Sequence, residues 1–323
     1  EITCRDWSSD VCSSDLLIIL LLGLFPDLFG GNVKNIVERV DPPFWFTSMK
    51  HKELQLLVYG RNLDQCRVEV QYPGLQITDY RVGPQGNYAF IDLVLGDDLL
   101  PGKAVFLLKK EKKILDWVEY EFKNRNIASG QKGLDASDVI YLLMPDRFAN
   151  GDTLNDSMSG MVEKANRNNP DGRHGGDLKG IENHLDYFVN LGVTSIWLNP
   201  VLENNNPAYS YHGYAITDFY TVDARLGTNG EYAGLVGAAH GKGLKVVMDM
   251  VFNHASIHGK LFKNLPDSNW VNHHPVFTRS NFRASSICDL YSSEYDKTKM
   301  LTGWFDTHRS EERRVGKECR SRW

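Results

Sequence analysis

Two patterns of hydrophobic and polar positions divide the chain. From residue 33 to residue 126, short segments rich in β-branched and aromatic residues alternate partly between apolar and polar positions, as in ELQLLVYG, YAFIDLVL and WVEYEF. Turn-forming residues separate these segments, as in GRNLD, YPG and GPQGN. Several short strands at this spacing predict an amino-terminal β-sandwich domain over residues 33–126.

The pattern changes after a polar linker at residues 127–137. DVIYLLM, VTSIWLNP and LKVVMDMVF are continuous apolar runs, which are typical of strands buried on both faces. Between them, IENHLDYFVNLG has apolar residues at helical spacing, and Thr228 with Glu231 forms a capping-box pattern. Alternating strands and helices predict a parallel sheet of βαβ units. A complete (β/α)8 barrel takes about 250 residues, so we expect a partial barrel over residues 138–308.

The two ends of the chain differ from the rest. Residues 1–16 and 309–323 have no periodicity and resemble translated sequencing-adapter DNA, which indicates an artefact, with a natural disordered tail as the alternative. Residues 17–32 form a segment that resembles a signal peptide and that contains most of the apolar run LLIILLLGLF at residues 16–25. This run is too short to span a bilayer and fits the core of a signal peptide. A buried strand or helix has the same composition. We expect a periplasmic or otherwise secreted protein with no stable membrane span.

Composition removes some functional classes. The 323 residues are 42% hydrophobic and 24% charged, as in globular proteins. The formal net charge is -5, so the chain lacks the excess of basic residues that is typical of nucleic-acid-binding proteins. Neither a Walker loop nor a strand–GxGxxG–helix unit is present, so nucleotide binding has no support.

One oxygen-rich segment follows the first strand of the predicted barrel. PDRFANGDTLND places Asn150, Asp152, Asn155 and Asp156 within seven positions. Calcium takes six to eight hard oxygen ligands, so a Ca²⁺ site is one interpretation. A turn capped by its own side chains is the other.

Two further segments carry candidate binding chemistry. YSYHGYAITDFY gathers tyrosines beside Gly213, where flat rings suit either sugar faces or packing under a long loop. In DMVFNH, Asp249 lies at the carboxyl end of a predicted strand, where the catalytic residues of barrels gather, and His254 follows. His254 and His258 have the spacing of a metal pair, but no HExxH motif accompanies them and zinc has weak support.

Together, GRHGGDLKG, GVTSIWLNP, YHGYAITDFY and DMVFNH resemble the α-amylase superfamily, glycoside hydrolase family 13, and its cyclomaltodextrinase and neopullulanase branch. The resemblance implies a multidomain α and β protein, in which an immunoglobulin-like β-sandwich precedes a TIM barrel. It implies a retaining α-glucan hydrolase that acts on α-1,4-glucosidic bonds of maltodextrin, cyclodextrin or pullulan. A transglycosylase of the same superfamily and a non-catalytic glucan-binding protein are the alternatives. The expected partner is an α-glucan, and a homodimer is the candidate assembly.

The resemblance also implies roles for individual residues. It makes Tyr214 a sugar-stacking ring and His254 a hydrogen-bond partner of the sugar, with Asp249 and Asn253 supporting the site. In this family the nucleophilic aspartate, the acid/base glutamate and a third aspartate follow the fourth, fifth and seventh strands. We therefore expect this chain to lack the catalytic carboxylates and to be inactive. The implied Ca²⁺ ligands are Asn150, Asp152, Asn155, Asp156, the carbonyl of Gly175, and Asp177.

Overall fold

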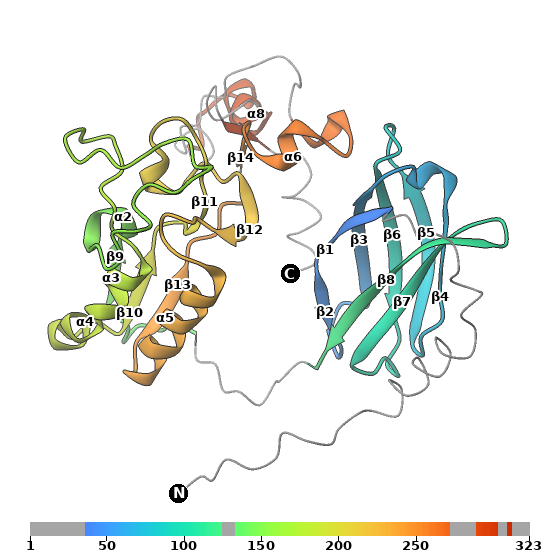
Figure 1. The fold of residues 1–323 in the computed structure, drawn as a ribbon, viewed down its shortest axis with the longest axis horizontal. Helices are drawn as coiled ribbons and strands as arrows, with labels where there is room; N and C mark the ends of the chain where they lie inside the picture. The colour runs from blue at the N-terminus through green and yellow to red at the C-terminus, as the bar shows by residue number, and fades with distance from the viewer. Residues whose placement is uncertain (1–35, 125–132, 253, 272–288, 303–308, 312–323) are drawn as a thin grey trace, which may run out of the picture. The chain divides into compact units, whose positions relative to one another are not determined.

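The computed structural model describes residues 36–124, 133–252, 254–271, 289–302 and 309–311 (Figure 1). The chain divides into two compact units between residues 128 and 129. The apolar run at residues 16–25 and most of both terminal blocks lie outside the described residues. Within the described ranges, no helix is both long enough and apolar enough to cross a bilayer.

The first unit is a β-sandwich of two four-stranded sheets (Figure 1), so the predicted sandwich is confirmed. One sheet has the strand order β1-β3-β6-β5, and the other has the order β2-β8-β7-β4. All pairs are antiparallel except β2 with β8. The strands are β1 (Val37–Asp41), β2 (Phe44–Phe46), β3 (Glu53–Gly60), β4 (Arg67–Val70), β5 (Leu75–Val82), β6 (Tyr88–Leu95), β7 (Gly102–Lys110) and β8 (Lys113–Lys123).

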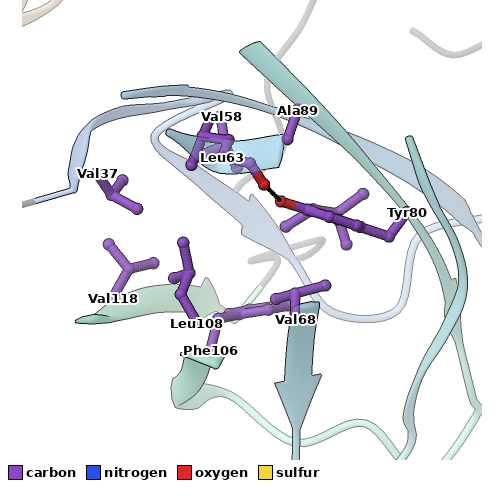
Figure 2. Close-up of a pocket in the computed structure, with 10 residues that line it drawn as sticks. Val37, Val58, Leu63, Val68, Tyr80, Ala89, Phe106, Leu108 and Val118 are labelled. Carbon is purple, nitrogen blue, oxygen red and sulfur yellow. Dashed lines mark hydrogen bonds between the residues drawn. The ribbon is translucent and has the colours of Figure 1, made fainter. Parts of the chain in front are cut away.

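The core of the sandwich follows from the alternation of its strands. Leu54, Leu56 and Val58 of β3 are buried and pack in one cluster with Phe106 and Tyr120 of the other sheet. A small apolar cavity lies in this core, with room for about one water molecule (Figure 2). Apolar side chains surround it, so it is a packing void and offers a ligand no polar anchor.

The second unit is built on a parallel sheet with the strand order β13-β10-β9. Strands β9 (Ile140–Leu143), β10 (Ser195–Leu198) and β13 (Lys245–Met248) run in register and end at the same edge. This is part of a TIM barrel, as predicted, and within the described ranges no fourth strand joins the sheet. The remaining elements are α2 (Pro145–Phe148), α3 (Leu178–Asn183), α4 (Leu185–Leu191), β11 (Leu202–Glu203), β12 (Asp218–Val222), α5 (Asn229–Gly241), β14 (His254–Ser256), α6 (Lys260–Lys263), α8 (Glu294–Thr302) and β15 (Arg309–Glu311).

The two faces of this sheet are covered differently. Tyr141, Ile196 and Val246 share one face and pack in a cluster with residues of α3, α4 and α5. On the other face, Leu142 is 61% exposed and Trp197 is 38% exposed. The apolar runs therefore predicted the strands correctly, but helices of the described chain pack against only one face of the sheet.

Helix formation also departs from the sequence pattern at one point. The spacing predicts a single helix through Ile181, Leu185 and Phe188, whereas α3 and α4 are separate and meet at His184. The His184 ring bonds through Nδ1 to the Gly180 carbonyl oxygen at 2.7 Å. In a continuous α-helix, that oxygen would accept from the backbone N–H of His184. Its backbone N–H instead donates to Ile181. The predicted capping box of Thr228 and Glu231 is present at the start of α5.

Candidate functional site

The carboxyl ends of the three parallel strands gather the predicted sugar-binding residues. Asp249 follows β13 directly. The hydroxyl of Tyr214 donates to Asp249 Oδ2 at 2.7 Å, although the two residues are 35 positions apart. Trp197 Nε1 donates to the same oxygen at 3.3 Å from the neighbouring strand. Asp249 therefore holds a ring from the long loop against the edge of the sheet.

The electrostatics of this contact keep the phenol neutral. Burial, followed by the hydrogen bond to Asp249 and its negative charge, raises the pKa of Tyr214 to about 12. Ionisation would place a phenolate beside a carboxylate. Tyr214 thus keeps its proton and remains a hydrogen-bond donor at neutral pH.

His254 holds the same tyrosine from the backbone side. Its Nε2 lies 2.7 Å from the carbonyl oxygen of Tyr214. A carbonyl only accepts hydrogen bonds, so Nε2 must carry the hydrogen. The structure therefore brings Tyr214, Asp249 and His254 together, while their roles in sugar binding stay a prediction. Asn253 lies outside the described residues.

A tightly bent segment presents Tyr214. Tyr209 has a positive φ of 59°, a 3-10 turn covers Ser210–His212, and Gly213 has a φ of 83°. A Cβ on Gly213 would lie 2.1 Å from the Pro200 carbonyl oxygen, so only glycine fits there. His212 Nδ1 accepts from the backbone N–H of Tyr214 at 2.9 Å. These constraints set the direction in which the Tyr214 ring leaves the loop.

The oxygen-rich loop also folds into one cluster. Asn150 Nδ2 donates to Asp156 Oδ1 at 2.7 Å. The Oδ1 atoms of Asn150 and Asn155 are buried with no hydrogen-bond partner in the described chain. Gly175 has a φ of 83°, and a Cβ there would lie 2.5 Å from Asp156 Oδ1. Buried acceptors without donors are costly, and a cation would satisfy them.

Asp177 has a different local role from the other predicted ligands. It is the N-cap of α3, and its carboxylate accepts from the backbone N–H groups of Gly180 at 2.6 Å and Asp152 at 2.8 Å. The Gly151 N–H lies 3.1 Å from both of its oxygens. Asp177 therefore ties the loop to the helix, with less of its carboxylate left for a cation.

Carboxylates alone do not make this a metal site. No three His, Cys, Asp or Glu side chains come together as a metal-binding group anywhere in the described ranges. A cation at the loop would depend on amide and carbonyl oxygens, which suits Ca²⁺. The zinc interpretation of His254 and His258 gains no third ligand from the described residues.

Sequence reasoning missed a set of buried charges in the second unit. Arg225 is fully buried and pairs with Asp223, Nη2 to Oδ2 at 2.7 Å and Nε to Oδ1 at 2.9 Å. Arg173 is 1% exposed and lies near Asp146. Charged residues inside the conspicuous segments GRHGGDLKG and DARLGT were the available signal.

Comparison with known proteins shows which protein families this chain matches. The family description "Alpha amylase, catalytic domain" matches residues 142–305, and "Cyclomaltodextrinase, N-terminal" matches residues 39–126. A beta/alpha-amylase of Paenibacillus polymyxa is 41% identical over 153 residues, which are 46% of this chain and 12% of the relative. Neopullulanase 2 of Thermoactinomyces vulgaris is 40% identical over 175 residues, which are 54% of this chain and 27% of the relative.

A third relative is the periplasmic alpha-amylase of Escherichia coli (strain K12). It is 36% identical over 132 residues, which are 36% of this chain and 19% of the relative. The chain thus spans about a tenth to a quarter of the length of these three relatives. The catalytic-domain match covers half of the chain, and it includes the end of β9, the whole of β10 and β13, and the cluster of Tyr214, Asp249 and His254. The chain therefore belongs to the alpha-amylase family of glycoside hydrolases, with a cyclomaltodextrinase-type amino-terminal domain.

Proposed function

We propose that the protein represented by this chain hydrolyses α-1,4-glucosidic bonds of maltodextrin, cyclodextrin or pullulan with retention. The observation that carries the proposal is the linked cluster at the end of β13, in which Tyr214 is held by Asp249 and His254. A relative named neopullulanase and the cyclomaltodextrinase-type domain support the choice of substrate.

Each residue of the cluster has a distinct task in this proposal. The ring of Tyr214 stacks on the sugar, and His254 contacts a sugar hydroxyl. Asp249 keeps the ring in place through the hydrogen bond from Tyr214. Retaining glycosidases need two carboxylates about 5 Å apart, one as nucleophile and one as acid/base. Asp249 instead accepts donors from Tyr214 and Trp197, so it positions the site.

We infer that the 323-residue chain by itself binds α-glucan without cleaving it. Calorimetric titration with maltoheptaose tests binding, and assay of released reducing sugar tests cleavage. Tyr214→Ala should weaken binding at least tenfold, about 1.4 kcal/mol. Tyr220, an exposed tyrosine of the same region, supplies the control Tyr220→Ala. Equal affinity for both variants would remove Tyr214 from the site, and sugar release above a blank would overturn the proposed lack of cleavage.

Product analysis decides between hydrolysis and the two alternatives. A hydrolase that contains this segment releases products that have gained water. A transglycosylase of the superfamily forms longer or cyclic glucans from the same substrate. A non-catalytic glucan-binding protein leaves the substrate intact while still requiring Tyr214. The match to an amylase catalytic domain favours an enzyme over a non-catalytic binding protein, and the relative named neopullulanase favours hydrolysis over transfer.

We also propose that the oxygen-rich loop holds Ca²⁺. Asn150, Asn155 and Asp156 would supply side-chain oxygens and Gly175 its carbonyl, with Asp152 and Asp177 completing the set. The unpartnered amide oxygens of Asn150 and Asn155 support the fit. When bound, the ion supplies a positive charge that holds these oxygens together.

A glycine pair offers a matched test of the calcium site. Gly175 and Gly160 have nearly the same positive φ, 83° and 84°. A Cβ at Gly175 would press on Asp156, whereas one at Gly160 would meet no atom of the described residues within 4 Å. Gly175→Ala should lower Ca²⁺ affinity in calorimetric titration, and Gly160→Ala should leave it unchanged. Equal Ca²⁺ affinity in the two variants would contradict the assignment.

Export to the periplasm, or secretion, completes the proposal. It is supported by the apolar run at residues 16–25 and by the relative named periplasmic alpha-amylase. Fractionation of the producing cells tests it, and recovery of the protein in the cytoplasm alone would refute it.

A further inference from the structure

We propose that Arg173 is a positioning residue that couples the cation loop to the sugar-binding segment 209–214. The proposal rests on the proposed function, because it links the two ligands of that function. Arg173 lies two positions before Gly175 in the chain, and its side chain reaches toward the segment that carries Tyr214.

On the loop side, Asp146 connects Arg173 to the cation site. Its carboxylate accepts from the backbone N–H groups of His174 at 2.8 Å and Gly175 at 3.2 Å. Arg173 Nε lies 3.6 Å from Asp146 Oδ1. A shift of the Gly175 peptide would therefore move the Asp146 carboxylate that faces Arg173. It would also move the backbone of Arg173, which lies two residues earlier in the same segment.

On the sugar side, Arg173 contacts the start of the bend that presents Tyr214. Its Nη1 lies 3.4 Å from both the carbonyl oxygen and the Oγ of Ser210. Glu163 holds the same residue from another direction, since its Oε2 accepts from the Ser210 N–H at 2.7 Å. Ser210 begins the turn that leads to Gly213 and Tyr214. Displacing Ser210 would thus rotate the platform on which the sugar is proposed to stack.

Stability alone does not account for this arginine. The side chain is 1% exposed, yet Nε and Nη2 have no hydrogen-bond partner in the described chain. The ion pair with Asp146 offsets part of the cost of burying this guanidinium, but its unused hydrogen-bond donors still cost folding free energy. What the arginine offers is geometric: one long, planar, always charged group spans two loops. We assign it the task of keeping those loops in a fixed relation.

The expected consequence is reciprocal coupling between Ca²⁺ and glucan. The carbonyl of Gly175 would be restrained when it holds Ca²⁺, and this restraint would pass through Arg173 to the bend at Ser210. Typical couplings between sites change affinity by about 5- to 150-fold, and thermodynamic linkage requires the same factor in both directions. We expect Ca²⁺ to tighten maltoheptaose binding roughly tenfold, and maltoheptaose to tighten Ca²⁺ binding by the same factor.

The first experiment uses the unaltered 323-residue chain. Maltoheptaose is titrated with chelator and with saturating Ca²⁺, and Ca²⁺ is titrated with and without maltoheptaose. Equal tightening in both directions supports the coupling. If both ligands bind but neither affects the other, the role of Arg173 is overturned while the proposed function stands. If either ligand fails to bind at all, the proposed function fails and this inference fails with it.

The second experiment assigns the coupling to Arg173. Arg173→Gln should retain Ca²⁺ binding and should bind maltoheptaose with the calcium-free affinity in both conditions. Arg173→Lys keeps the buried positive charge but lacks the planar guanidinium group. It therefore provides a folded variant in which most of the coupling should still be lost. Arg167→Gln is the matched control, because Arg167 is exposed and donates to the His174 carbonyl in the same loop. Full coupling in both Arg173 variants, or an equal loss in Arg167→Gln, would overturn the assignment.

Discussion

Replacing Asp223 by asparagine should destabilise the barrel unit severely. The carboxylate is 1% exposed and accepts from Arg225 Nε at 2.9 Å and Nη2 at 2.7 Å. It also accepts from the backbone N–H groups of Arg225 and Asn204, both at 3.0 Å. Asparagine has nearly the same shape but no charge, so Arg225 would become a buried cation without a counter-ion. Removing one partner of a buried pair costs about 3–5 kcal/mol, a large part of a typical domain stability of about 5–15 kcal/mol.

Urea unfolding followed by far-UV circular dichroism measures this loss. The α-helices of the described chain all lie in the second unit, so the helical signal reports that unit. Asp186→Asn is the control, because it removes a carboxylate that pairs with Lys242 but is 76% exposed. An exposed pair contributes about 0–1 kcal/mol. The double variant Asp223→Leu with Arg225→Met should lose less than Asp223→Asn, because Arg225 is then no longer left as a buried cation without its carboxylate partner. Similar losses for Asp223→Asn and Asp186→Asn would refute the reasoning.

The same pair predicts an acid dependence. Burial raises the pKa of Asp223, but hydrogen bonds from Arg225 and the positive charges of Arg173 and Arg225 outweigh burial and hold the pKa below its ordinary value. The folded pKa thus lies below the unfolded value of about 3.9. The contribution of Asp223 to stability is complete above about pH 5 and declines as the pH falls through about 4 and below. Asp223→Asn should therefore make unfolding less steeply dependent on pH in this acid range.

Three further changes test the local architecture. Gly213→Ala should weaken maltoheptaose binding, since the new Cβ would meet the Pro200 carbonyl oxygen at 2.1 Å; calorimetry measures the effect, and unchanged affinity would contradict the role of the bend. Asp249→Asn should lower the pKa of Tyr214 from about 12 toward the ordinary value of about 10. Alkaline ultraviolet titration measures this pKa, and an unchanged value would show that burial alone sets it. Thr228→Ala should cost about 1 kcal/mol in urea unfolding by removing the capping box of α5, and no loss would mean that tertiary packing holds this helix end.

The sequence by itself determined the elements whose cause is local. Continuous apolar runs identified β9, β10 and β13, because the strands of a parallel sheet carry apolar side chains on both faces and so lack polar alternation. Alternating segments identified the sandwich, and the Thr228 and Glu231 pattern identified the start of α5. The family motifs also singled out Tyr214, Asp249 and His254 before their contacts were known.

Only the tertiary structure decided how distant residues meet. The parallel register of β9, β10 and β13 brings Trp197 to Asp249, and the bend before Tyr214 places its carbonyl against His254, 40 positions away. The burial of Arg173 and Arg225 could not be read from the chain, because a charged residue is buried only where several segments supply its partners. The break at His184 arose for a related reason, since its ring takes a carbonyl that the helical pattern assigns to the backbone. Periodicity along the chain determines which face of an element is apolar, whereas the packing of several elements determines which polar groups come within hydrogen-bonding distance.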